Sequence, residues 1–150
     1  MAVKPIPDGY RSVTPYLAVE GADQLLDFVQ KAFGAEVLMS MPSPDGKVGH
    51  AEVRIGDSVV MLADASTSDQ GQAMPGMIHL YVEDCDATYR RAMDAGATSL
   101  REPSDQFYGD RTGGVRDPVG NHWWIATHVE DIPPEEMGKR AEEAMKQGQS

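Results

Sequence analysis

The strongest constraint on the fold is an internal repeat. Residues 17–23 read LAVEGAD, and residues 80–86 read LYVEDCD, 63 positions further along the chain. Apolar residues at helical spacing follow each copy and stop at a Gly-Ala pair, beginning at Gly34 in the first copy and at Gly96 in the second. A strand, a helix and a stop in the same order at a fixed offset predict two copies of one structural unit.

Each helix of the repeat is expected to be followed by three strands. In the first unit these are residues 36–41, 47–55 and 58–63, and in the second they are 98–101, 107–116 and 121–128, with a polar loop at 103–106. The expected apolar stripes of the helices are Ala22, Leu26, Val29 and Phe33 in the first unit and Cys85, Tyr89, Ala92 and Met93 in the second. The pattern predicts an α+β fold built from two βαβββ modules.

The repeat also divides the chain. We expect module 1 at about residues 11–65, a linker at 66–75, module 2 at about 76–130 and a C-terminal helix at 133–147. Met137, Ala141 and Met145 give that helix one apolar stripe, which needs the sheet or a second subunit to cover it. We therefore predict a homodimer.

Charge and composition exclude several classes of partner. The chain has 13 Lys and Arg against 24 Asp and Glu, a net charge of −11, and its basic residues are scattered. Nucleic acid and anionic membranes are therefore not expected partners. No apolar run is long enough to span a membrane, and the first residues lack a hydrophobic signal region. The single cysteine, Cys85, fits a reducing cytoplasm and a place in the core.

Three segments carry a family resemblance that extends from about Val13 to Val129. The run DPVGNHW at 117–123 resembles the D-P-x-G-x-x-W signature of the glyoxalase/bleomycin-resistance/dioxygenase superfamily, also called the vicinal oxygen chelate proteins. The runs FYGDR at 107–111 and IHLYV at 78–82 resemble its PhnB-type branch more narrowly. The resemblance implies curved mixed sheets around a cavity, in a fold that serves isomerases, epimerases, dioxygenases, antibiotic-modifying enzymes and binding proteins.

The resemblance further implies where a metal would bind in metal-dependent members. Placed on this sequence, the ligand positions are Thr14, Met61, Met77 and Trp124. None is His, Glu or Gln, so no metal is expected at the usual position. A displaced divalent-metal site stays open as a hypothesis, with His79, Glu52 and either His50 or His122 as ligands.

Strand alternation predicts which side chains line the concave side. Aliphatic residues occupy one face of each strand and should pack against the helices, which leaves the polar and aromatic residues on the other face. The predicted ligand-binding residues on that face are Tyr16, His50, Glu52, His79, Tyr81, His122 and Trp124. The alternative for His50 and Glu52 is a solvated charge pair, and the alternative for His122 is a role in the adjacent turn.

The glycine-rich segment around residues 108–114 adds two candidates. Tyr108 and Arg111 could contact a ligand, because glycines allow close approach and a guanidinium matches a carboxylate or phosphonate. The alternative is a surface ion pair on an edge strand.

Two functions follow from these residues. The first is a small-molecule-binding protein that holds a small, partly aromatic organic ligand in a concave pocket of Tyr16, His79, Tyr81 and Trp124. The second is a divalent-metal-dependent lyase, isomerase or dioxygenase that acts on a vicinal-oxygen substrate. The ligand types at the implied metal positions favour the first.

Overall fold

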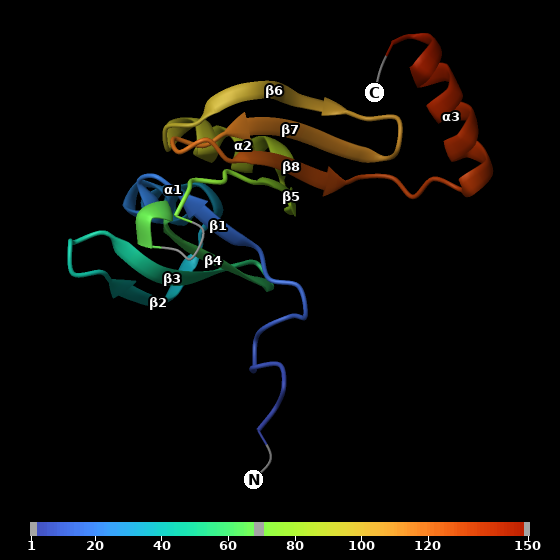
Figure 1. Cartoon of the computed structure of the whole chain (residues 1–150). Helices are drawn as coiled ribbons and strands as arrows, with labels where there is room; N and C mark the ends of the chain where they lie inside the picture. The colour runs from blue at the N-terminus through green and yellow to red at the C-terminus, as the bar shows by residue number, and fades with distance from the viewer. Residues whose placement is uncertain (1–2, 68–70, 149–150) are drawn as a thin grey trace.

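The computed structural model describes residues 3–67 and 71–148 and has two modules, each a four-stranded sheet with one helix (Figure 1). Module 1 contains β1 (Tyr16–Val19), α1 (Ala22–Phe33), β2 (Glu36–Pro42), β3 (Val48–Ile55), β4 (Ser58–Asp64) and a 3-10 turn at Ala65–Thr67. Module 2 contains β5 (Met77–Tyr81), α2 (Cys85–Asp94), β6 (Thr98–Asp105), β7 (Asp110–Arg116) and β8 (His122–His128), and α3 (Pro134–Lys146) follows it. The predicted α+β fold with two βαβββ units is confirmed.

The two sheets are built in the same way. Their strand orders are β1-β4-β3-β2 and β5-β8-β7-β6, with the first pair parallel and the others antiparallel. Tyr16 pairs with Met61 in module 1, and His79 pairs with Trp124 in module 2, so both members of the second pair lie 63 positions after those of the first. The strands that hold the repeated motif are therefore equivalent.

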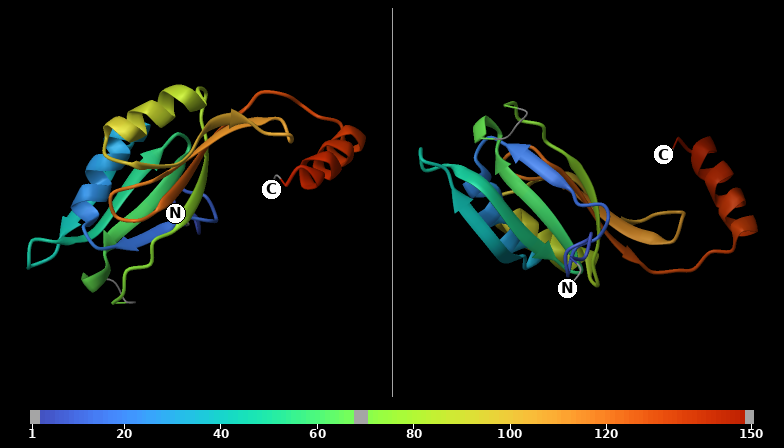
Figure 2. Two further views of the ribbon diagram at one scale, coloured as in Figure 1. Left: turned by 90° about the horizontal axis from the view of Figure 1, so that it is seen from above. Right: turned by 60° about the horizontal axis from the view of Figure 1, so that its bottom comes forward.

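The modules share one hydrophobic core. Helices α1 and α2 pack against each other (Figure 2), and the ring of Phe33 at the end of α1 lies 4.7 Å from that of Trp123 in β8. Each helix thus meets both a sheet and the other helix, so its buried face is wider than the predicted stripe. The fully buried residues are Ala22, Leu25, Phe28, Val29 and Ala32 in α1 and Cys85, Thr88 and Ala92 in α2, whereas Leu26, Phe33, Tyr89 and Met93 are half-buried.

The segment between β6 and β7 differs from the prediction. Residues 103–105 belong to β6, and the turn lies at residues 106–109 instead of at 103–106. Pro103 is tolerated because β6 is an edge strand whose register shifts between Arg101 and Ser104. Gly109 has φ +95 in the turn, where a Cβ would lie 2.3 Å from the carbonyl oxygen of Glu130.

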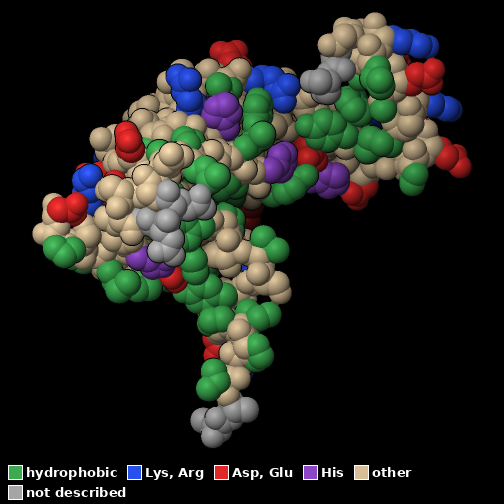
Figure 3. All heavy atoms as spheres, viewed as in Figure 1, with side chains coloured by type: hydrophobic (Ala, Val, Ile, Leu, Met, Phe, Trp, Pro, Cys, Tyr) green, Lys and Arg blue, Asp and Glu red, His purple; other side chains and the backbone are tan. Residues whose placement is uncertain are grey.

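Helix α3 lies beyond the β6–β7 turn, apart from the two sheets (Figure 1). Arg140 links it to module 2, with Nη2 2.7 Å from Glu130 Oε1 and Nη1 donating to the Phe107 carbonyl. Hydrophobic side chains gather on the side of α3 that looks toward the sheets (Figure 3). Of the predicted stripe, Met137 and Ala141 are half-buried and Met145 is 76% exposed, whereas Ala144, which the prediction left out, is buried.

Among the described residues, no helix is long and apolar enough to cross a membrane. The expected cytoplasmic location stays a prediction.

Candidate functional site

The outward face of the module 1 sheet carries a row of large side chains. Strand register aligns Tyr16, Met61, Glu52 and Met39 across β1, β4, β3 and β2. The row faces away from α1, because the alternate residues of each strand form the core. His50 lies on the same face of β3, with its ring 5.8 Å from that of Tyr16. Tyr16, His50 and Glu52 are therefore neighbours, as the alternation predicts.

Glu52 is the buried acid of this face, at 7% exposure. The Tyr10 hydroxyl donates to its Oε1, and His50 Nε2 lies 2.7 Å from its Oε2. Burial alone would raise the pKa of Glu52, but the hydrogen bonds from Tyr10 and His50 together outweigh burial and leave the pKa lowered. The carboxylate is therefore ionised at neutral pH, and hydrogen bonding to it raises the pKa of Tyr10.

A pocket of about 390 Å³ opens beside Glu52. The N-terminal segment projects from the module 1 sheet (Figure 1). Its residues form one side of this pocket. The lining residues are Pro5, Ile6, Pro7, Tyr10, Arg11, Ser12, Thr14, Glu52 and Met61. The sequence does not predict a role for Tyr10, because this residue lies before the repeat, where no periodic pattern assigns it to a face.

Module 2 carries the equivalent row on its outward face. Register aligns His79, Trp124, Gly114 and Arg101 across β5, β8, β7 and β6. Arg101 holds its guanidinium carbon 5.0 Å from the centre of the Trp124 ring, a cation–π contact. The rings of His79 and Tyr81 stand edge to face at 5.0 Å. His79, Tyr81 and Trp124, three of the predicted residues, thus lie together with Arg101. Arg101 was not among the predicted residues, because only the strand register places it in this row.

A second buried acid, Asp110, organises the end of this face. At 3% exposure, its Oδ2 accepts from the Tyr81 hydroxyl at 2.7 Å and its Oδ1 lies 2.8 Å from His128 Nδ1. His128 Nε2 in turn lies 2.7 Å from Asp131 Oδ1. Hydrogen bonds to Asp110 and then to Asp131 raise the pKa of His128, and Asp110 likewise raises that of Tyr81. Asp110 and Gly114 are four residues apart on β7, and this even spacing indicates that both lie on the same face of the sheet.

His79 and Tyr81 also border a groove between the two modules. The groove has a volume of about 1210 Å³ and reaches from Phe33 and Ile55 of module 1 to His128 of module 2. A ligand on the module 2 face could therefore extend toward the module boundary.

Three predicted site residues lie away from these rows. Arg111 points to the helix side of β7, where Nε lies 2.7 Å from Asp86 Oδ1 and Nη1 lies 3.3 Å from Asp105 Oδ1, which raises its pKa. The ion pair of the alternative is therefore present, with Asp86 and Asp105, but β7 is an inner strand of its sheet and not the edge strand that the alternative expected. Tyr108 lies in the β6–β7 turn with its ring 5.2 Å from that of Phe107. His122 is half-buried at the start of β8, opposite Met77.

The predicted gathering of four residues in one pocket is not found within a single chain. Tyr16 belongs to the first sheet, whereas His79, Tyr81 and Trp124 belong to the second. In the part of the chain that the structure describes, the strands of each sheet pair only with strands of the same module, so the two sheets do not close around a common cavity. Alternation correctly assigned the faces of β1, β3, β5 and β8, but it carries no information on how two sheets are oriented.

The residues of the hypothetical displaced metal site are likewise split between the two sheets. His50 and Glu52 lie on the first sheet, and His79 and His122 lie on the second. Over residues 3–67 and 71–148, no three His, Cys, Asp or Glu side chains come close enough to hold a metal ion. A hydroxyl, two thioethers and an indole at Thr14, Met61, Met77 and Trp124 do not form a divalent-metal set either.

The DPVGNHW turn is structural. Asp117 Oδ1 accepts from the backbone N–H groups of Val119 and Asn121, and its Oδ2 accepts from Asn121 Nδ2 and from Trp123 Nε1 at 2.8 Å. Asn121 Oδ1 accepts from the Gly76 N–H at 2.7 Å. The turn thus fixes the start of β8 to the segment that enters β5.

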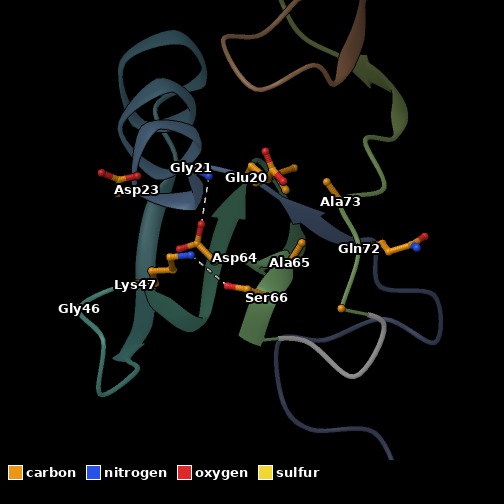
Figure 4. Close-up of a pocket in the computed structure, with 12 residues that line it drawn as sticks. Glu20, Gly21, Asp23, Gly46, Lys47, Asp64, Ala65, Ser66, Gln72 and Ala73 are labelled. Atoms are coloured by element: carbon orange, nitrogen blue, oxygen red, sulfur yellow. Dashed lines mark hydrogen bonds between the residues drawn. The ribbon is translucent and has the colours of Figure 1, made fainter.

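A further pocket, of about 680 Å³, lies at the N-terminus of α1 (Figure 4). Asp64 points into it, but Oδ1 already accepts from the N–H groups of Gly21 and Ala22, and Oδ2 accepts from that of Val48. Lys47 Nζ donates to Ser66 Oγ at 3.2 Å. Asp64 therefore caps the helix and joins it to β3 and β4.

The profile of the Glyoxalase/Bleomycin resistance protein/Dioxygenase superfamily matches residues 12–125, a span that includes both modules up to β8. The chain belongs to this superfamily. An uncharacterized protein from Mycobacterium tuberculosis H37Rv is 39% identical over 135 residues, which cover 84% of this chain and 79% of that protein. An uncharacterized protein from Mycobacterium bovis is likewise 39% identical over 135 residues, 89% of its length.

Solved structures share the fold of this chain. TioX from Micromonospora sp. ML1 superposes with a TM-score of 0.68 at 26% identity, over 79% of this chain and 99% of TioX. Lactoylglutathione lyase from Agrobacterium tumefaciens superposes with a TM-score of 0.61 at 19% identity, over 83% of this chain and 96% of the enzyme. The second likeness concerns the fold alone.

Proposed function

We propose that this member of the superfamily is a small-molecule-binding protein that holds a small, partly aromatic organic ligand against its concave faces. The observation that carries the proposal is the row of His79, Trp124 and Arg101 on module 2. The half-buried indole of Trp124 offers a flat stacking surface, and His79 beside it offers a hydrogen bond. The narrower resemblance to the PhnB-type branch is part of the same proposal.

The alternative, a divalent-metal-dependent lyase, isomerase or dioxygenase, has less support. The side chains at the positions implied for metal ligands are unsuited to a divalent ion, and the histidines of the chain are divided between its two sheets.

We also propose that the protein works as a homodimer. Side chains on the outward faces of both sheets are open to solvent in one chain, with Tyr16 46%, Tyr81 61% and Met77 70% exposed. Pairing the module 1 face of one chain with the module 2 face of its partner would cover them and enclose a ligand. Tyr16 and His79 would then belong to one pocket, although they lie on separate sheets of one chain.

Trp124 provides a reporter for the test. Trp123 is fully buried, so a bound ligand should leave its fluorescence unchanged. A ligand that stacks on the module 2 face should therefore change only the fluorescence of Trp124. We expect the neutral aromatic 2-naphthol to alter this signal, and His79→Ala to weaken its binding by about 1 to 3 kcal/mol. Arg90→Ala, on the exposed side of α2, should bind as the wild type does. Equal affinity in all three proteins would contradict the assigned site.

A further inference from the structure

We propose that Glu52 is the recognition group for an organic cation, a protonated amine carried on an apolar or aromatic body. This inference rests on the proposed function and assigns a ligand class to the module 1 half of the site. It starts from the pocket of about 390 Å³ beside the buried carboxylate.

The negative charge of Glu52 has no cationic partner of fixed charge. Its hydrogen-bond partners are the phenol of Tyr10 and the imidazole of His50, and within the described ranges no Lys or Arg forms an ion pair with it. Each carboxylate oxygen has two acceptor positions, and each uses one, so both can accept an N–H from a ligand. A buried, ionised carboxylate gains most from a partner that brings the opposite charge.

The walls of the pocket suit the body of such a ligand. Pro5, Ile6, Pro7 and Met61 contribute apolar surface, and an organic cation would bury its carbon skeleton against them while its ammonium group meets Glu52. Among the described residues that line the pocket, Arg11 alone is positively charged, and its Nη2 lies 3.4 Å from Asp57 Oδ2. The net charge of −11 further raises the local concentration of cations and lowers that of anions.

The pocket also coincides with the implied metal position. Thr14 and Met61, the two module 1 residues at that position, both line it, and Met61 pairs with Glu52 across β4 and β3. At the position where the family resemblance implies a metal ion, this chain has the carboxylate of Glu52, a hydroxyl and a thioether; His50 lies beside the carboxylate, and no third His, Cys, Asp or Glu of the described residues joins these two. Such a set lacks the ligands for a divalent ion but can receive a single ammonium group.

A series of ligands with one ring and different charges tests the inference. We would titrate 2-phenylethylamine, 2-phenylethanol and 3-phenylpropanoate into the full-length protein and into Glu52→Gln by calorimetry at neutral pH. Because charge-assisted hydrogen bonds are the strong ones, the amine should bind about tenfold to a hundredfold tighter than the alcohol, and the carboxylate should bind weakest. In Glu52→Gln the amine and the alcohol should differ by no more than about twofold.

Glu142→Gln is the matched control. It makes the same change in net charge on α3, where Glu142 is 72% exposed and pairs with Lys146, so the preference for the amine should persist. If Glu52→Gln does not fold, the charge series on the wild type still decides between the outcomes.

Three results would overturn the inference. Equal affinity for all three ligands would do so while leaving the proposed binding function intact. Zn²⁺ or Mn²⁺ binding that Glu52→Gln abolishes, with no amine preference, would make Glu52 a metal ligand instead. If no member of the series binds, the inference is wrong, and the separate titration of 2-naphthol against Trp124 decides whether the proposed function is wrong too.

Discussion

A Cβ on residue 114 would lie 2.3 Å from Cζ3 of Trp124, so the indole fills space that only a glycine leaves open above β7. The neighbouring strands make this contact unavoidable, because Gly114 and Trp124 are register partners. The stacking surface of the proposed site therefore depends on the absence of a side chain on the adjacent strand.

Gly114→Ala should displace Trp124 and weaken ligand binding. The added methyl group cannot be accommodated without moving the indole or the strand, and such overpacking costs about 1 to 3 kcal/mol. Urea unfolding would measure the loss of stability, and 2-naphthol titration would measure the loss of affinity. Gly138→Ala, in α3 with open space around it, should instead stabilise its helix slightly. Unchanged affinity in Gly114→Ala would argue that the indole position is irrelevant to binding.

Asp117→Ala should be among the most destabilising substitutions in module 2. It removes the acceptor for Trp123 Nε1 and Asn121 Nδ2, both in residues that are fully buried, and an unsatisfied buried donor costs about 1 to 3 kcal/mol. We expect a loss of at least about 3 kcal/mol in urea unfolding. Asp105→Ala, 75% exposed, should cost far less. Similar losses for both variants would contradict the structural role of the signature turn.

The sequence predicted the fold well because its strongest signals are local. The repeat of LAVEGAD and LYVEDCD carries the order of strand, helix and stop, and alternation in β3 and β5 assigns the face of each side chain. Alternation also predicts that Glu52 and His79 lie on the outward faces of their sheets, away from the helices. These inferences need no knowledge of how the modules are arranged.

The parts that failed depend on distant contacts. The buried face of α1 is wider than predicted because α1 also packs on α2. The apolar spacing within one helix does not indicate a contact with a second helix. The link between Tyr10 and Glu52 joins residues 42 positions apart, and Tyr10 lies outside every pattern. For Arg111 the sequence left two alternatives, a ligand contact and a surface ion pair, because its partners, Asp86 and Asp105, are brought to it only by the tertiary fold.

The stability of module 2 should depend on pH through His128. Hydrogen bonds to Asp110 and Asp131 raise its pKa above the ordinary 6.5, so its contribution is complete below pH 6.5 and is lost as the pH rises through the higher folded-state pKa. The difference in unfolding midpoint between wild type and His128→Gln should therefore shrink with rising pH. His79→Gln removes an imidazole from the same sheet without breaking an ion pair and serves as the control. A difference that grows with pH would refute this.

The protein should have twice the 16.3 kDa mass of one chain in light scattering at high micromolar concentration. Met77→Glu should lower the mass toward that of the single chain, because it places a charge on the exposed module 2 face. Met145→Glu tests the alternative surface on α3. A monomer in the wild type would disprove the homodimer, and dissociation by Met145→Glu alone would assign the contact to the C-terminal helix.

Arg111→Gln should separate stability from ligand binding. The guanidinium is held by Asp86 and Asp105 on the helix side of β7, opposite the face that carries Trp124. Because partly exposed ion pairs contribute little, we expect a small fall in the unfolding temperature and an affinity for 2-naphthol within about twofold of the wild type. His79→Ala should show the reverse pattern, with affinity lost and stability kept. The anionic analogue 2-naphthoate provides the decisive comparison. If Arg111→Gln weakens the binding of 2-naphthoate about tenfold without lowering the unfolding temperature, the prediction is wrong. The guanidinium would then leave its ion pairs to bind the carboxylate of a ligand.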